Sequence, residues 1–151
     1  MDIGEIRTDH MTLPRSEKLH YYENFYKTTG KLVHPIVIDE ENRLRDGYIS
    51  YLLARKYGEQ IDILKVPSRQ SIAKIVIGRH VYRVDGEYRI KCNKCYRWLY
   101  DLGHAVVPGD ILRVETKKGK AYMCVEKIDY LIGKECYSQH ARALKHMENK
   151  I

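Results

Sequence analysis

The sequence has few of the features that mark membrane proteins or secreted proteins. No apolar run approaches the about 18 residues that a membrane-spanning helix needs, and the N-terminus, MDIGEIRTDHM, is too acidic for a signal peptide. Four cysteines in a chain of 151 residues do not suggest a secreted disulfide scaffold, so reduced thiols or a metal site are the better interpretations. We therefore expect a cytoplasmic protein that has no membrane partner.

Motifs for several common chemistries are also missing from the sequence. The chain has no phosphate-binding P-loop, no dinucleotide-binding glycine pattern, and no nucleophile elbow around a serine or cysteine. It has no internal repeat and no low-complexity segment. Since it also has no helix-turn-helix or zinc-finger pattern, a sequence-specific reader of DNA is not indicated.

Aromatic residues and charge are what the sequence does have in an unusual distribution. Phenylalanine and tryptophan occur once each, whereas tyrosine occurs thirteen times. A tyrosine joins a flat apolar ring to a polar tip, which suits a half-buried binding face. Residues 1–66 hold ten Lys or Arg and eleven Asp or Glu, a net charge of −1, whereas residues 67–151 hold seventeen and nine, a net charge of +8.

The basic second half favours a polyanionic partner. Nucleic acid is the first candidate and an acidic protein is the second, because a cationic surface attracts both over a long range. The remaining interpretation is a solubilising surface that has no partner.

The first half reads as a helix, a strand, a turn, a second helix and a second strand. Apolar positions recur three or four residues apart between Ser16 and Thr29, which predicts an amphipathic helix that ends at Gly30. The elements that follow are short and closely spaced: a β-rich run at 32–38, a return strand at 43–45, a helix at 48–57 and a strand at 61–66.

The ordered segments PIVID, LRDGY, the helix that carries Ala54, Gly58 and then IDILKV resemble the N-terminal domain of the ParB/sulfiredoxin-like superfamily over residues 31–66. The resemblance implies a small α/β fold in which the Asp46-Gly47 turn and the next helix N-terminus line a nucleotide or phosphate site. Free N–H groups at a helix start bind anions, and glycine lets a ligand approach the backbone closely.

The reactive residues of this superfamily are replaced in the chain. ParB-type proteins follow this glycine with a pair of arginines and sulfiredoxins place a reactive cysteine there, but the chain reads GYIS from Gly47. Without a thiol the sulfiredoxin reaction has no nucleophile, which excludes that activity. Arg43, Arg45 and Arg55 are close enough in sequence to substitute for the arginine pair, and Gly47 with Arg43 and Arg45 is the predicted phosphate site.

Asp46 is the candidate catalytic residue of this half, with Asp39 and Glu40 as further carboxylates for a divalent metal. An enzyme built on them would be a ParB-like metal-dependent nuclease or a nucleotide hydrolase. The other role for Asp46 is a cap at the N-terminus of the helix at 48–57. We favour the cap, and with it a site scaffold that is not catalytic.

In the second half, a polar link at 67–71 leads into short strands. Asp85-Gly86 is a strong two-residue hairpin signal. It sets Val81 opposite Ile90, Tyr82 opposite Arg89, His80 opposite Lys91 and Arg83 opposite Tyr88. Alternation then sorts the hairpin residues into a core face (Val81, Tyr88, Ile90, Cys92) and a second face (His80, Tyr82, Arg89, Lys91). Such a second face binds phosphates with its cations and stacks bases on its rings, or else is an ordinary exposed polar face.

Further cations continue through the second half. They lie in the segment CNKCYRWLYDLG and at the tip of a hairpin between strands predicted at 111–115 and 121–128. Short strands at this spacing predict a small, bent antiparallel sheet or partial barrel, a shape often used to hold nucleic acids. The predicted nucleic-acid-binding residues are His80, Tyr82, Arg89, Lys91, Lys94, Arg97, Lys117, Lys118 and Lys120.

The chain is predicted to end in a helix at 134–149 whose apolar stripe docks on the sheet. Cys92 and Cys95 form a C-x-x-C pair, and Cys136 and His140 would lie one helical turn apart, so these four residues are candidate zinc ligands. Cysteine and histidine on an apolar stripe are more often packed than ligating. We therefore expect no metal and no cofactor.

Taken together, these patterns predict an α+β protein with a ParB-like α/β unit at 1–66 and a basic β-rich unit at 67–151, whether or not the two share one core. The predicted function is non-catalytic binding of DNA or RNA by backbone contacts and stacking. The rivals are the ParB-like enzyme and a small interaction or inhibitor factor of a mobile element that presents positive charge to another protein.

Overall fold

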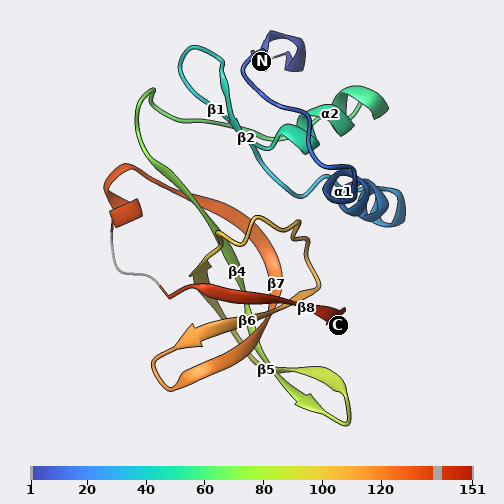
Figure 1. The fold of residues 1–151 in the computed structure, drawn as a ribbon, viewed down its shortest axis with the longest axis vertical. Helices are drawn as coiled ribbons and strands as arrows, with labels where there is room; N and C mark the ends of the chain where they lie inside the picture. Colours follow the sequence, from blue (N-terminus) through green and yellow to red (C-terminus); the bar gives the residue numbers. More distant parts are fainter. Residues whose placement is uncertain (1, 138–140, 151) are drawn as a thin grey trace. The chain divides into compact units, whose positions relative to one another are not determined.

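The computed structural model of the chain describes residues 2–137 and 141–150 (Figure 1). Within these ranges it is a mixed α+β fold in which strands predominate, with two α-helices and eight strands in two sheets. The chain divides into two compact units, Met1–Gln70 and Ser71–Ile151. Neither α-helix in the described part of the chain is long and apolar enough to cross a membrane.

The first unit is a small α/β fold, and both of its predicted helices are confirmed. Its elements are η1 (Ile3–Glu5), α1 (Ser16–Thr29), β1 (Ile36–Ile38), β2 (Leu44–Asp46), α2 (Tyr48–Tyr57) and β3 (Ile63–Lys65). Strand β1 is the central strand, antiparallel to β2 and parallel to β3. Its residues are all buried, which explains why this short run is apolar throughout instead of alternating.

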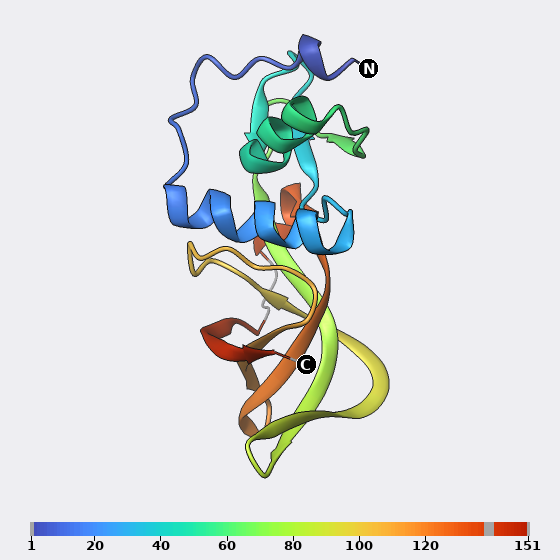
Figure 2. The ribbon, with the colours of Figure 1, turned by 90° about the vertical axis from the view of Figure 1, so that its right-hand side faces the viewer.

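The second unit is a five-stranded antiparallel sheet in the order β5-β4-β7-β6-β8. Its elements are β4 (Ile72–Val84), β5 (Glu87–Leu99), β6 (Asp110–Thr116), β7 (Gly119–Ile132), η2 (Gly133–Tyr137) and β8 (Ala143–Lys150). The long strands β4 and β7 bend strongly (Figure 2). The N–H of Leu99, at the end of one edge strand, donates to the carbonyl of Ala141, just before the other edge strand (2.9 Å), so the sheet is partly closed.

The predicted C-terminal helix at 134–149 is wrong. The segment begins with the short η2 and continues as β8, which pairs with the edge of β6. The sequence ALKHMENK is rich in helix-forming residues, but the edge of β6 presents backbone N–H and C=O groups that need partners. Pairing with the sheet therefore overrides the local helix preference.

The sheet of the second unit carries a hydrophobic cluster on each face. Alternation along β7 separates them: Met123 and Val125 belong to the larger cluster, and Tyr122 and Cys124 to the smaller. We call the two sides the Trp98 face and the Tyr122 face. The first is named for the buried Trp98 of the larger cluster and the second for the half-buried Tyr122 beside the smaller.

Candidate functional site

The β4–β5 hairpin has the predicted register at its tip. Val81 pairs with Ile90, Tyr82 with Arg89, and Arg83 with Tyr88. Asp85 and Gly86 both have positive φ (52° and 80°), as a two-residue turn of this hand requires. The predicted register is therefore confirmed over these three pairs.

Below the tip the predicted register fails. Arg79 pairs with Cys95, so the register shifts and residues 91–94 bulge out of the ladder with β4. The predicted pairing of His80 with Lys91 is therefore wrong. Cys92, predicted to face the core, is exposed for the same reason.

An aromatic layer runs from the core of the Trp98 face outward to the hairpin. The ring centroid of His80 lies 5.2 Å from that of Trp98 and 4.9 Å from that of Tyr96. Exposure rises along the layer, from 3% at Trp98 to 36% at Tyr96 and 45% at Tyr82, the residue two positions beyond His80 on β4. The structure thus presents two rings to solvent, one of them held against a packed aromatic base.

Cations lie beside both of these rings. Nζ of Lys94 lies 5.2 Å from the ring centroid of Tyr96. Arg89 is the cross-strand partner of Tyr82, and its guanidinium lies 3.8 Å from a carboxylate oxygen of Glu87, with both side chains largely exposed. Exposed pairs of this kind contribute little, so the guanidinium can exchange this partner for another anion. We call His80, Tyr82, Arg89, Lys94 and Tyr96 the ring-and-cation face.

The remaining predicted cations lie elsewhere. Arg97 pairs with Ile77 and alternates with Tyr96 and Trp98, which places it on the opposite face. Lys117 and Lys118 form the exposed turn between β6 and β7, and Lys120 pairs with Glu115 at the start of β7. Lys91 is exposed in the bulge. The nine predicted residues therefore do not form one continuous surface.

Gly47 occupies the N-cap position of α2 with φ 88°. A Cβ placed there would collide with the carbonyl oxygen of Pro35 and would lie 2.9 Å from Cα of Ile36. The space beside this glycine is thus filled by the chain that leads into β1. Backbone packing on the Cβ side of this position therefore requires a glycine.

The cap predicted for Asp46 is wrong, because Gly47 holds the cap position and no side chain caps α2. Oδ1 of Asp46 accepts the N–H of Gly47 (2.8 Å), and its Oδ2 lies 4.0 Å from Nε2 of the buried His34. Asp39 is also engaged in the backbone, since its Oδ1 accepts the N–H groups of Glu41 and Arg43 (2.8 and 3.0 Å). Both carboxylates therefore stabilise the turns around β2.

The candidate phosphate-binding arginines are engaged away from the Gly47 turn or exposed. Nη2 of Arg45 donates to the carbonyl of Gln70 (2.9 Å), and Nη1 of Arg55 donates to the hydroxyl of Tyr51 (3.0 Å). The side chain of Arg43 is exposed. No contact in the described structure assembles them around one anion position.

The candidate zinc ligands do not converge in the part of the chain that the structure describes. Cys95 donates to Oε2 of Glu126 (3.1 Å), and this hydrogen bond, with desolvation, raises the pKa of its thiol. Cys136 donates to the carbonyls of Ser71 and Leu131 (3.4 and 3.3 Å). His140 lies outside the described residues. Among the described His, Cys, Asp and Glu residues, no group of three or more is placed to hold a metal.

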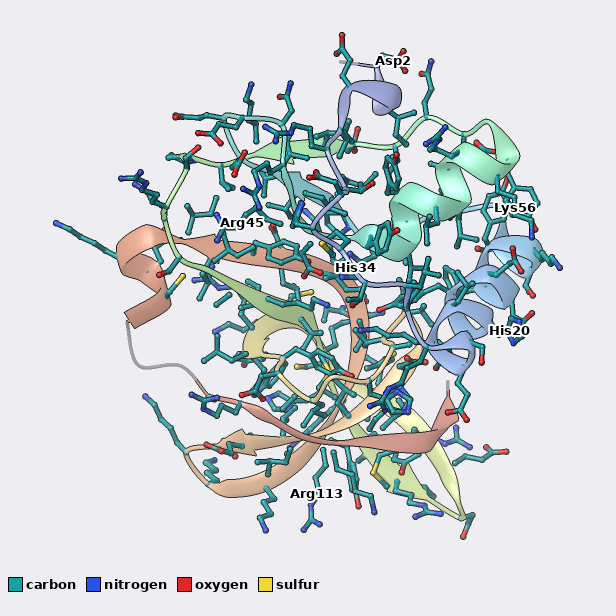
Figure 3. All side chains as sticks on the ribbon, turned by 45° about the horizontal axis from the view of Figure 1, so that its top comes forward. Asp2, His20, His34, Arg45, Lys56 and Arg113 are labelled. Carbon is teal, nitrogen blue, oxygen red and sulfur yellow. The ribbon has the colours of Figure 1, made fainter. Side chains whose placement is uncertain are left out.

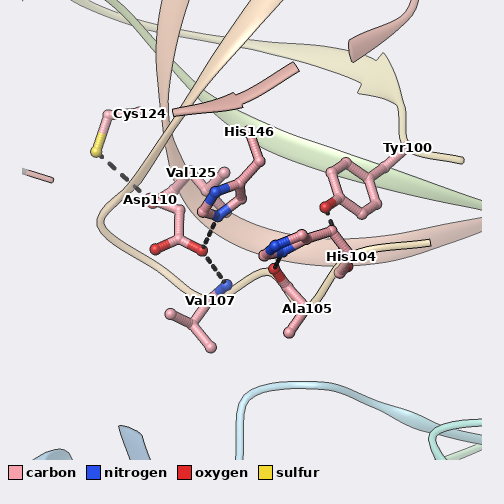
Figure 4. Close-up of polar contacts among 8 residues, drawn as sticks. All are labelled: Tyr100, His104, Ala105, Val107, Asp110, Cys124, Val125 and His146. Carbon is pink, nitrogen blue, oxygen red and sulfur yellow. Dashed lines mark hydrogen bonds and ion pairs between the residues drawn. The ribbon is translucent and has the colours of Figure 1, made fainter. Parts of the chain in front are cut away.

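A buried polar cluster that the sequence did not indicate lies between β6 and β8 (Figure 4). Asp110 is fully buried, its Oδ2 accepts the N–H of Val107 (3.0 Å), and it lies 2.8 Å from Nε2 of His146. The ring of His104 stacks on His146 with centroids 4.6 Å apart. The cluster joins β8 to β6 and to the loop that precedes β6. It was missed because His146 was predicted on a helix.

No model of a known protein family, no curated protein and no solved structure matches the chain. The ring-and-cation face offers π surfaces on which bases stack and positive charges for phosphates.

Proposed function

We propose that the second unit binds nucleic acid, DNA or RNA with unpaired bases, through the ring-and-cation face and without reading base sequence. The observation that carries the proposal is the pair of exposed rings, Tyr82 and Tyr96, each beside a cation. Base stacking on such rings tolerates any sequence, because every base has a π face.

The packing beneath the rings supports this proposal. Tyr96 rests against His80 and is 6.1 Å from Trp98, centroid to centroid, so its ring is held in place before a ligand arrives. A ring that is already ordered loses less side-chain entropy on binding than a free one. The surplus positive charge of residues 67–151 adds a long-range attraction for a polyanion.

Fluorescence anisotropy with labelled thymidine and uridine oligonucleotides tests the proposal. We expect the double variant Tyr82→Ala, Arg89→Ala to bind about tenfold more weakly or worse, because stacking contributes about 1–3 kcal/mol per base. The matched control Tyr82→Phe, Arg89→Lys keeps the ring and the charge and should bind close to the unchanged protein.

A salt series distinguishes phosphate binding from other association. In a plot of the logarithm of affinity against the logarithm of salt concentration, the slope should be about −0.7 for each phosphate that the protein neutralises on a single strand. No detectable binding at micromolar protein concentrations, or an affinity that does not depend on salt concentration, would refute the proposal. Capture of an acidic protein that survives nuclease treatment would support an interaction factor in its place.

We also propose that the first unit is a ParB-like unit without its phosphate site. The order of elements supports this, with β1 parallel to β3 and α2 between them along the chain. Pro35 and Ile36 occupy the Cβ side of Gly47, which leaves no room for a ligand to approach the backbone from that side. The test is cleavage of single-stranded and plasmid DNA with divalent metals: we expect none, and cleavage that Asp46→Ala abolishes would establish the enzyme instead.

A further inference from the structure

Three residues form a row across the Tyr122 face. Tyr122 on β7 pairs with Arg113 on β6, and Arg113 pairs with Lys145 on β8. Directly opposite residues of antiparallel strands have Cβ atoms about 4.5–5.5 Å apart, so Arg113 is an immediate neighbour of both Tyr122 and Lys145. We call Tyr122, Arg113 and Lys145 the cation row. None of the three was among the predicted binding residues.

The two cations of the row are adjacent, and Glu115, the carboxylate two residues after Arg113 on the same face of β6, forms no ion pair with either of them. Like charges directly opposite each other destabilise a sheet. Among the side chains that the structure describes, neither Arg113 nor Lys145 forms an ion pair, and both are exposed. Figure 3 shows Arg113 extending from β6. Some other cations of the unit do have carboxylate partners, such as Arg79 with Glu126 (2.6 Å) and Arg142 with Asp101 (2.7 Å).

The neighbourhood of the row is also cationic. Lys120 precedes Tyr122 by two residues on β7 and so shares its face, with Glu115 as its cross-strand partner. Lys117 and Lys118 form the turn that ends this hairpin. The ring of Tyr122 is held edge-on to the buried Tyr88, with centroids 5.4 Å apart. A fixed ring therefore adjoins an excess of positive charge.

We infer that the cation row binds phosphate groups of a nucleic-acid strand, as a second contact on the face opposite the ring-and-cation face. The nature of the ligand rests on the proposed function; the position rests on the register of β6, β7 and β8. A guanidinium binds two phosphate oxygens at once, and the ammonium beside it adds a point charge. A phosphate between the two also removes the repulsion that the free sheet carries.

The experiment compares two double variants of the full chain. Arg113→Ala, Lys145→Ala removes the row, whereas the control Lys127→Ala, Arg142→Ala removes the same charge from cations that have carboxylate neighbours at 4.0 and 2.7 Å. With a labelled thymidine oligonucleotide of about 15 nucleotides, the first variant should bind about tenfold more weakly. Its salt slope should fall by about 1.4, which corresponds to two lost phosphate contacts. The control should change both quantities much less.

Stability provides a second readout. The single variant Lys145→Ala removes the like-charge neighbour of Arg113. Without ligand, the midpoint of its thermal unfolding should therefore be equal to or above that of the unchanged protein, while its affinity for the oligonucleotide falls.

Equal losses of affinity in the two double variants would show that the row acts only through the net charge of the protein, and this would overturn the inference. Unchanged affinity in the row variant, with loss in Tyr82→Ala, Arg89→Ala, would overturn the row alone and leave the proposed function standing. No binding by the unchanged protein would overturn both.

Discussion

At the scale of single residues, Gly47 combines two reasons why a position needs glycine: a left-handed backbone conformation and the close approach of other backbone atoms. Its positive φ is shared with Gly58, but of these two glycines only Gly47 has backbone atoms within reach of an added Cβ. We predict that Gly58→Ala costs about 1 kcal/mol for the left-handed conformation. Gly47→Ala should cost about 3 kcal/mol, because the collision with Pro35 and Ile36 adds to that strain. Urea unfolding followed by far-UV circular dichroism measures both, and equal costs would contradict the close approach.

Cys95 provides a test of local electrostatics. Its hydrogen bond to Glu126 raises the pKa of the thiol, so less of the reactive thiolate is present at neutral pH. In a Cys92→Ser background, Glu126→Gln should therefore speed the alkylation of Cys95 by iodoacetamide at neutral pH. Peptide mass spectrometry over time measures the rate at this cysteine. A rate that stays the same or falls would show that the carboxylate does not suppress the thiolate.

The sequence predicted residue neighbours only where the chain is regular. Asp85-Gly86 fixes a turn, and from it the pairing of Tyr82 with Arg89 follows by counting. Counting residues from the turn no longer gives the pairing of β4 with β5 beyond Ile90, because no local sequence signal shows how many residues bulge out of the paired strands. The exposure of Cys92 and the contact of His80 with Trp98 depend on that bulge, so the sequence did not predict them.

At the scale of elements, the side chain of Glu23 on α1 forms hydrogen bonds with α2. Its Oε2 accepts hydrogen bonds from Lys56 (2.9 Å) and Tyr57 (3.0 Å), and these hold the pKa of its carboxyl below the ordinary 4.5. A lowered folded pKa stabilises the fold above the unfolded pKa, and this contribution is lost as the pH falls through the folded value. Glu23→Gln should therefore lower stability at neutral pH but not in strong acid. Urea midpoints across an acid series measure this, and a difference that persists in strong acid would contradict it.

Strand β8 depends on the buried pair of Asp110 and His146. Removing the imidazole leaves a fully buried carboxylate without one of its partners, which costs about 3 kcal/mol. We predict that loss for His146→Ala, measured by urea unfolding with the fluorescence of Trp98. Arg142→Ala is the matched control, since its ion pair with Asp101 is exposed and should cost less than about 1 kcal/mol. Similar losses would contradict a structural role for the buried pair.

The two helices of the first unit and β8 show which elements a sequence can reveal. Apolar spacing together with Gly30 and Gly58 defined α1 and α2, because glycine in the left-handed conformation ends a helix locally. No local signal distinguishes β8 from a helix, since its residues prefer the helical state and only the edge of β6 gives it a partner. The cation row and the cluster at Asp110 both need β8, so neither could be predicted.

At the scale of the whole molecule, the sequence located the positive charge but not its distribution over the sheet. The surplus of +8 in residues 67–151 is a property of composition. Alternation and the bulge divide those cations between two faces, with Arg89 and Lys94 on the Trp98 face and Arg97 and Lys120 on the other. A surface that depends on five paired strands cannot be assembled from the order of residues alone.

The two units are expected to respond separately to mutation, because each has a core of its own. The cluster around Ile36 and Leu44 uses first-unit residues, whereas those around Val76 and Tyr88 use second-unit residues. Both α-helices that the described residues form lie in the first unit, and the single tryptophan lies in the second, so two spectroscopic probes report on the two units separately.

We predict that Gly47→Ala lowers the urea midpoint of the helical circular dichroism signal and leaves that of Trp98 fluorescence unchanged. His146→Ala should do the reverse, because a cost confined to one core moves only the transition of that core. If both probes shift together in both variants, the two units unfold as one cooperative structure. In that case their free energies of unfolding cannot be assigned to separate cores.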